Sequence, residues 1–275
     1  MLRGLWATLT FDMITSRQNP IVARYRAAAR GDDESLLLLD GVHLVGDALA
    51  AGVPLHDVAV ASEALSRDDV SAVVAALERA HVPFVAASAT VMAALSPVRS
   101  PSPVVALARR PTLDSSRLYS GTAPLVVIAV DVQDPGNLGA IVRAAEAAGA
   151  TGLVAAGACA NPFGWKALRG SMGSALRVPL AVAERVETAI DEARRHRCHV
   201  VATAPRGGRS IFDVDFRTAT AMLIGPEGSG LPPPLIDGAD ERVTIPMQAP
   251  VESLNAAVTA ALMLYEARRQ RTRQP

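Results

Sequence analysis

The chain has little cysteine, no long apolar run and no excess of charge of either sign. Its two cysteines, Cys159 and Cys198, are too few for a disulfide framework or a metal cluster, so a reduced, cytoplasmic setting is expected. No apolar stretch is long enough for a membrane span, because charged residues such as Asp40 and Glu266 interrupt the best candidates. Residues 1–12 have a short apolar run without a convincing cleavage site, which indicates a loose extension and not a secretion signal.

Lysine is nearly absent, and the net charge is zero. Lys166 is the only lysine among 27 basic residues, and 27 acidic residues balance them, so no global basic field argues for nucleic acid. Local clusters are more informative: Arg17, Arg24, Arg26 and Arg30; Lys166, Arg169 and Arg177; and Arg268, Arg269, Arg271 and Arg273. Each cluster is either a solvated face or an RNA contact, and the sequence leaves both open.

Hydrophobic patterning predicts two α/β domains. Half of the residues are apolar and a fifth are charged, which is a globular composition. Between residues 36 and 107 strand patterns (36–39, 58–60, 104–107) alternate with helical ones (44–51, 70–80). Residues 109–124 are rich in turn formers and are the expected linker. We therefore expect a first domain at 1–112 and a second at 121–275.

The second half alternates strands and helices more strongly. Its strand patterns are 125–130, 152–156, 199–203 and 221–224, and its helical patterns are 137–148, 190–197 and about 253–269. Continuous apolar runs are typical of strands that are buried on both faces, so this half is predicted to be an α/β domain with a parallel sheet. Its last helix carries one apolar stripe, formed by Leu254, Val258, Ala261, Leu262 and Tyr265.

Three segments follow predicted strands, where ligands bind in parallel α/β sheets. The first, residues 131–143, opens a helix that Asn137 is suited to cap. Arg143 points away from the apolar stripe of that helix and stands among small residues, which leaves room for a substrate or a partner chain. A surface ion pair with Glu146 explains the same arginine, and this segment alone does not decide between the two.

The second segment is rich in glycine, and the third carries several polar residues. In residues 223–232, Gly225, Gly228 and Gly230 surround Glu227, which indicates either a tight turn or a loop that lines a ligand. The loop has neither the Lys-Ser/Thr of a Walker motif nor the dinucleotide fingerprint. In residues 245–255, Ser253 is suited to cap the last helix, which would place Asn255 at its positive end.

In order and spacing, these segments together resemble the three motifs of the SpoU (TrmH-type) family of SPOUT methyltransferases, over residues 121 to 270. The leading domain resembles the family's α/β/α ribosomal-protein-like substrate-binding domain at 14–22, 39–45 and 102–107. The resemblance implies a trefoil-knot catalytic domain and a homodimer with its site near the subunit interface. It also implies methyl transfer from S-adenosylmethionine to a ribose 2′-hydroxyl, in ribosomal RNA in preference to transfer RNA.

The resemblance also implies a role for individual residues. Arg143 matches the family's catalytic arginine, supported by Asn137, Glu227, Ser253 and Asn255. Main-chain groups of Gly225, Ile245 and Leu254 should hold the adenosine of the cofactor, with Thr203, Ala204 and Met247 bordering the pocket. RNA contacts are expected from Arg17, Arg24, Arg26, Lys166 and Arg169, and no metal is expected. Two residues depart from the family pattern: Gly170 replaces the usual alanine, and Ala249, which would narrow the cofactor loop, replaces a common glycine.

Arg143 is expected to position the substrate more than to remove its proton. A guanidinium has a pKa above ~12 and is a reluctant base, so we expect it to bind the phosphate beside the target ribose and to orient the hydroxyl. The proton then leaves through that phosphate or through a transiently neutral arginine. The alternative is a non-catalytic RNA- or ribosome-binding protein that retains the fold. An oxidoreductase that uses a nicotinamide cofactor is disfavoured by the missing fingerprint.

Overall fold

The computed structural model describes residues 13–112 and 115–272, and the chain divides into two compact units, Met1–Pro111 and Thr112–Pro275. The loose extension expected over residues 1–12 lies outside the described residues. No helix in the described part of the chain is long and apolar enough to cross a membrane.

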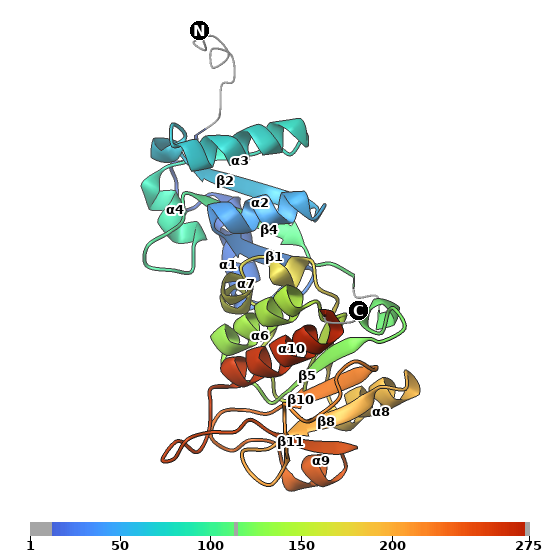
Figure 1. Cartoon of the computed structure of the whole chain (residues 1–275). Coiled ribbons are helices and arrows are strands. Elements are labelled where there is room, and N and C mark those ends of the chain that lie inside the picture. Colours follow the sequence, from blue (N-terminus) through green and yellow to red (C-terminus); the bar gives the residue numbers. More distant parts are fainter. Residues whose placement is uncertain (1–12, 113–114, 273–275) are drawn as a thin grey trace. The chain divides into compact units, whose positions relative to one another are not determined.

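A four-stranded sheet with the order β1-β4-β2-β3 forms the centre of the N-terminal unit (Figure 1). Its strands are β1 (Leu36–Asp40), β2 (Leu55–Ala61), β3 (Val85–Ala87) and β4 (Val104–Arg109). Its helices are α1 (Pro20–Arg30), α2 (Val42–Ala50), η1 (Ser62–Ala64), α3 (Asp68–Arg79) and α4 (Ala89–Leu95). β4 is antiparallel to β1 and β2, and β3 is parallel to β2. The predicted small α/β unit is confirmed, with α1, β3 and α4 added to the elements that the sequence indicated.

The C-terminal unit is built on a parallel seven-stranded sheet with the order β7-β6-β5-β10-β8-β11-β9. The strands are β5 (Leu125–Val130), β6 (Gly152–Ala156), β7 (Leu180–Ala183), β8 (His199–Thr203), β9 (Arg209–Ser210), β10 (Thr220–Ile224) and β11 (Glu241–Thr244). The helices are α5 (Ser115–Leu118), α6 (Pro135–Ala148), α7 (Trp165–Ser171), η2 (Ser174–Leu176), α8 (Val186–Arg195), α9 (Pro233–Asp237) and α10 (Ala256–Thr272). Because β10 lies between β5 and β8, loops far apart in sequence meet at one edge of the sheet.

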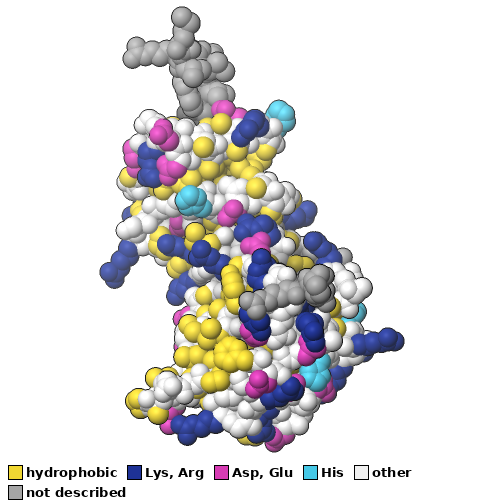
Figure 2. Space-filling model, in the orientation of Figure 1, with side chains coloured by type: hydrophobic (Ala, Val, Ile, Leu, Met, Phe, Trp, Pro, Cys, Tyr) yellow, Lys and Arg dark blue, Asp and Glu magenta, His cyan; other side chains and the backbone are white. Residues whose placement is uncertain are grey.

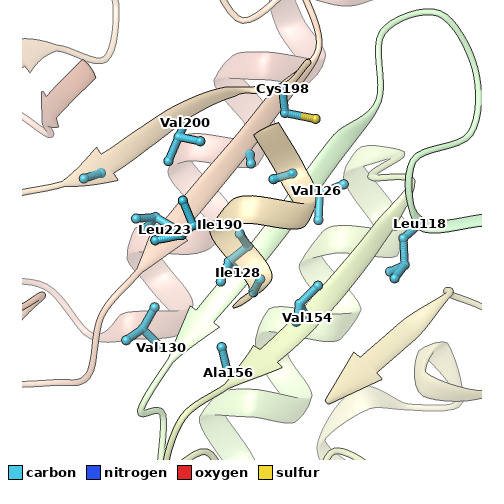
Figure 3. Close-up of a cluster of buried hydrophobic side chains, with 14 of the residues drawn as sticks. Leu118, Val126, Ile128, Val130, Val154, Ala156, Ile190, Cys198, Val200 and Leu223 are labelled. Carbon is cyan, nitrogen blue, oxygen red and sulfur yellow. The ribbon is translucent and has the colours of Figure 1, made fainter. Parts of the chain in front are cut away.

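One face of this sheet packs against α8. Alternate side chains of β5, among them Val126 and Ile128, contact Ile190 of α8 in a buried cluster (Figure 3). Leu118 and Tyr119 belong to the same cluster, although the sequence placed them in a linker that ended at residue 124. The second unit therefore begins ahead of residue 121, because α5 supplies part of its core.

Helix α6 lies between α7 and α10 (Figure 1). Its predicted stripe is confirmed, with Leu138, Ile141, Val142, Ala145 and Ala148 all buried. A Cβ at Gly139 would lie 2.5 Å from the carbonyl oxygen of Ala167, so α7 packs directly on this glycine. A Cβ at Gly170 would lie 3.2 Å from Gly136 O, a close contact, so the family's alanine would need a small shift of its neighbour here. Gly139, one of the small residues near Arg143, therefore accommodates α7 and does not leave room for a substrate or a partner chain.

Helix α10 is apolar on two faces. Ala260, Met263 and Leu264 are fully buried, whereas Val258, Leu262 and Tyr265 remain 47%, 41% and 53% exposed. The helix begins at Ala256, so Leu254 precedes it and is not part of its stripe.

The end of α10 is fixed by Arg271. Its half-buried guanidinium donates to the carbonyl oxygens of Phe216, Ala123 and Thr218 at 2.7, 2.7 and 2.6 Å. Burial lowers the pKa of Arg271, and Gln270 beside it donates to Val214 O at 2.8 Å. From the sequence, Arg271 was grouped with the other basic residues of the tail. In the structure, its guanidinium binds the loops that lead into β5 and β10.

Candidate active site

A pocket opens at the carboxyl ends of β8, β10 and β11. All six residues expected to contact a cofactor line it: Thr203, Ala204, Gly225, Ile245, Met247 and Leu254. Ser253 lines it as well. Ala249 is exposed and does not line the pocket, so this departure from the family pattern does not narrow the cavity.

The glycine loop after β10 forms one wall of this pocket from its main chain. A Cβ at Gly225 would lie 2.7 Å from the backbone nitrogen of Leu231, so no larger residue fits there without a shift of the loop. Gly228 and Gly230 have φ of +84° and +65°, a conformation that favours glycine. Beneath the loop, the Thr203 hydroxyl donates to Leu223 O at 2.9 Å and joins β8 to β10.

A second hollow adjoins the first. Its walls come from the loop after β5 and from the glycine loop, and include Asp131, Gln133, Asp134, Asn137 and Glu227. The two cavities share Pro226, Ser229 and Ala256. A group bound in one therefore lies next to a group bound in the other.

Asn137, Glu227 and Asn255 form a hydrogen-bonded cluster at this boundary. Asn137 Nδ2 donates to Glu227 Oε1 at 3.0 Å, and Asn255 Nδ2 donates to Asn137 Oδ1 at 3.1 Å and to Glu227 Oε1. The backbone N–H of Ala256 donates to the same carboxylate oxygen at 3.3 Å. Three segments that are distant in the sequence therefore share one polar centre.

Both helix caps differ from those expected. Asp134, not Asn137, caps α6, and its Oδ1 accepts from Asn137 N at 2.7 Å. Asn255, not Ser253, precedes the first turn of α10, and its Oδ1 accepts from Ala257 N at 2.9 Å. Capping by Asp134 leaves the side chain of Asn137 available for Glu227.

Arg143 is exposed and lies apart from this cluster. Glu146, the partner that a surface ion pair would need, instead makes a bidentate pair with Arg177 at 2.6 and 2.9 Å, which lowers the pKa of the carboxyl. Arg143 lies six residues after Asn137, about 9 Å further along α6, and lines neither cavity. A single chain thus brings together every expected active-site residue except the arginine.

The expected RNA contacts lie on exposed positions of both units. On α1, Arg24 pairs with Asp57 at 2.9 Å, and Arg26 Nε donates to Ala94 O at 3.4 Å. Arg17 is exposed just before that helix. In the C-terminal unit, the ammonium of Lys166 lies 5.4 Å from the centre of the Trp165 ring, and Arg169 is exposed one turn later.

The two cysteines are held within the fold: one thiol is hydrogen-bonded to the backbone and the other is buried. The Cys159 thiol donates to Ala129 O at 3.2 Å and accepts from Val132 N at 3.2 Å, while burial raises the pKa of Cys198 to about 11. Among the residues that the structure describes, no cluster of His, Cys, Asp or Glu could hold a metal ion.

Sequence reasoning missed several residues of the second hollow, among them Asp131, Gln133 and Asp134 from the segment after β5. Asp131 has φ of +52°, and its Oδ1 accepts from Ala158 N at 2.7 Å. The only signal in the sequence was their place directly after a buried strand.

The second unit is a parallel sheet whose end loops frame a pocket and an Asn–Glu–Asn cluster, the arrangement expected of the catalytic domain of a SPOUT-type methyltransferase. Residues 124–265 match the SpoU rRNA methylase family, and residues 11–118 match the N-terminal domain of thiostrepton-resistance methylases. The chain belongs to the SpoU rRNA methylase family.

Relatives and solved structures match nearly the whole chain. An uncharacterized tRNA/rRNA methyltransferase of Synechocystis is 33% identical over 95% of this chain and 96% of its own. The Bacillus subtilis 23S rRNA (guanosine(2553)-2′-O)-methyltransferase RlmP is 29% identical, over 84% of this chain and 88% of its own.

Two structures solved with S-adenosylmethionine bound have the same fold. The rRNA methyltransferase of Sinorhizobium meliloti is 30% identical, with a TM-score of 0.81 over 94% of this chain and 97% of that one. AviRb of Streptomyces viridochromogenes is 29% identical, with a TM-score of 0.81 over 94% of this chain and 100% of that one. The expected SPOUT (trefoil-knot) fold class, S-adenosylmethionine as cofactor and RNA methyltransferase activity are confirmed over the non-catalytic alternative.

Proposed function

We propose that the chain transfers a methyl group from S-adenosylmethionine to a ribose 2′-hydroxyl in 23S rRNA. The observation that carries this proposal is the Asn137–Glu227–Asn255 cluster at the boundary of two adjoining cavities. One cavity accommodates the methyl donor and the other the acceptor nucleoside. The RNA that RlmP modifies, and the ribose position, support the choice of substrate. A cytoplasmic location fits that substrate.

The first cavity suits the cofactor. Its glycine loop presents main-chain N–H and C=O groups, which can bind an adenine edge and ribose hydroxyls, and Ile245, Met247 and Leu254 supply apolar walls. When bound, S-adenosylmethionine supplies an electrophilic methyl on a sulfonium.

The polar cluster positions the acceptor. Glu227 accepts hydrogen bonds from both asparagine side chains and from the Ala256 N–H, which fixes the amides before the substrate binds. Asn137 and Asn255 then orient the ribose hydroxyl, and Ser253 lies on the cofactor side of the same boundary. The orientation of the hydroxyl matters because in-line displacement requires the attacking oxygen to lie opposite the sulfur, on the far side of the methyl carbon.

Arg143 acts in a homodimer. Since it lines neither cavity of its own chain, we infer that Arg143 of a second copy reaches the site, binds the phosphate beside the target ribose and orients the hydroxyl. The surface for this second copy is the exposed stripe of Val258, Leu262 and Tyr265 on α10, where hydrophobic side chains gather in Figure 2. Helix α10 packs against α6, which carries Arg143.

The N-terminal unit docks the RNA. Arg17, Arg24 and Arg26 contact phosphates without taking part in the chemistry, and Lys166 and Arg169 extend the contact on the catalytic unit.

Methylation mapping tests the proposed function. We expect 23S rRNA from host cells that lack the protein to accept tritiated methyl from S-adenosylmethionine when the purified chain is added, at a ribose 2′-oxygen. Calorimetry on the same preparation should show that the cofactor binds and that NAD does not. Cofactor binding without methylation of that RNA would contradict the proposed substrate.

A further inference from the structure

The hollow beside the cofactor pocket is built from a loop that is held in place at several points. Asp131 Oδ1 accepts from Ala158 N, Val132 N donates to Cys159 Sγ, and Asp134 Oδ1 accepts from Asn137 N, at 2.7, 3.2 and 2.7 Å. A Cβ at Gly157 would lie 2.4 Å from Asp131 Oδ1, so the loops after β5 and β6 cross closely. The φ of +52° at Asp131 is an uncommon conformation for a residue other than glycine, and such residues cluster at functional sites.

Gln133 stands in the middle of this loop and serves none of these contacts. Its side chain is exposed and lines the hollow, and no hydrogen bond involves it among the described residues. An amide group offers one acceptor and two donors. Because the backbone on both sides is fixed, only the side chain of Gln133 has to be ordered when a ligand binds.

The charges that line the hollow exclude a phosphate. Asp131, Asp134 and Glu227 are carboxylates, and none of the described lining residues is basic. One oxygen of each carboxylate is engaged by the protein, which leaves the other as an acceptor for N–H groups. The hollow therefore favours a neutral group rich in N–H donors.

We propose that this hollow binds the base of the methylated nucleotide, and that the base is guanine. This inference rests on the proposed function, because the hollow shares its wall with the cofactor pocket and a ribose at that wall places its base inside. The Watson–Crick edge of guanine offers two N–H donor groups to the carboxylates and one acceptor, O6, to the Gln133 amide. Uracil offers two acceptors and one donor, and its carbonyl oxygens would face the carboxylates.

Nucleoside analysis tests the base directly. 23S rRNA from host cells that lack the protein is methylated by the full-length chain with tritiated S-adenosylmethionine, and the RNA is digested to nucleosides. We expect the label in 2′-O-methylguanosine. Label in another 2′-O-methylnucleoside would overturn the guanine inference and leave the proposed function intact. No label in any 2′-O-methylnucleoside would overturn both.

Gln133→Ala tests the residue. We expect kcat/KM for the RNA to fall by about 10- to 100-fold, the range of one lost base contact, while the affinity for S-adenosylmethionine is unchanged. Asp191→Ala, an equally exposed change on α8, is the control and should leave both values as they are. A Gln133→Ala variant with the wild-type kcat/KM would overturn the assignment.

An RNA with a modified base tests whether the carboxylates of the hollow contact the base or only hold the loop in place. Asp131 and Asp134 also hold the loop, so the nucleoside is changed and not these residues. An RNA fragment with inosine at the mapped position lacks the 2-amino donor, and wild-type protein should methylate it about tenfold more slowly. Equal rates on guanosine and inosine would contradict reading by the carboxylates.

Discussion

The Asn137 side chain donates a hydrogen bond to Glu227 over 3.0 Å, although ninety residues separate the two in sequence. Parallel pairing of β5 with β10 brings them together, because helix α6, which carries Asn137, and the loop that carries Glu227 follow these strands at the same edge of the sheet. Asn255 joins them from the segment before α10. The site thus depends on strand order more than on any local motif.

Glu227→Ala should stop most methyl transfer with little loss of stability. The substitution leaves the amides of Asn137 and Asn255 and the Ala256 N–H without their shared acceptor, so the acceptor ribose loses its alignment. We expect kcat to fall on the order of 100-fold and the free energy of unfolding to fall by about 1 kcal/mol. Single-turnover methylation and chemical denaturation measure the two effects. A near wild-type kcat would mean that the cluster does not position the substrate.

Leu262→Glu should convert a dimer to a monomer. Leu262 is 41% exposed in one chain, on the stripe where we place the second copy, and a carboxylate there would be buried without a partner. Light scattering should give the dimer mass for wild type and the monomer mass for the variant, and the variant should bind S-adenosylmethionine but not methylate RNA. Phe212→Glu is the control, since Phe212 is 63% exposed and belongs to the segment after β9 and not to α10. A monomer mass for the wild-type protein would contradict the proposal that two copies share the site.

The strands of the catalytic sheet could be predicted where they are buried on both faces. The runs 125–130, 152–156 and 199–203 coincide with β5, β6 and β8, because a central parallel strand is apolar throughout. β7, β9 and β11 were missed. They lie toward the sheet edges, and β11 carries Glu241 and Arg242, so their patterns are short and mixed.

The sequence also predicted residues that line one pocket, at the carboxyl ends of β8, β10 and β11, but not the contacts within the site. A local pattern identifies Asn137 and Ser253 as capping residues, and it cannot show that Asp134 and Asn255 precede the helices instead. The partner of Arg177 is Glu146, on another helix, and Arg271 reaches loops more than fifty residues away. Such pairings depend on tertiary packing between distant segments, and a local sequence pattern does not show which distant residue will be the partner.

Arg271→Ala should destabilise the catalytic unit. The guanidinium donates to carbonyl oxygens of the loops that lead into β5 and β10, and these acceptors would lose a charged donor. We expect the free energy of unfolding to fall by about 2–3 kcal/mol, and Arg271→Lys to restore little of it, because an ammonium lacks the planar fork. Arg268→Ala, an exposed change on the same helix, should stay within about 0.5 kcal/mol of wild type. Equal stability of the Arg271 and Arg268 variants would show that these contacts contribute nothing.

Arg143→Ala should abolish methyl transfer and leave both the fold and the cofactor site intact. Arg143 is exposed on α6, and its neighbour Glu146 is already paired with Arg177, so its removal should change the free energy of unfolding by no more than about 0.5 kcal/mol. S-adenosylmethionine should bind with unchanged affinity, since Arg143 does not line the pocket.

The conservative change Arg143→Lys separates charge from geometry at the same position. An ammonium keeps the charge but cannot hold a phosphate and a hydroxyl together in one plane, so this variant should fail nearly as completely. Mixing Arg143→Ala with Glu227→Ala tests whether the site is shared. In a 1:1 mixture that has exchanged subunits, about half of the dimers are heterodimers, and each contains one site with both residues intact. Activity should therefore return to about a quarter of wild type only if Arg143 serves the partner's site. An Arg143→Ala variant that methylates RNA at the wild-type rate would show that another group orients the hydroxyl.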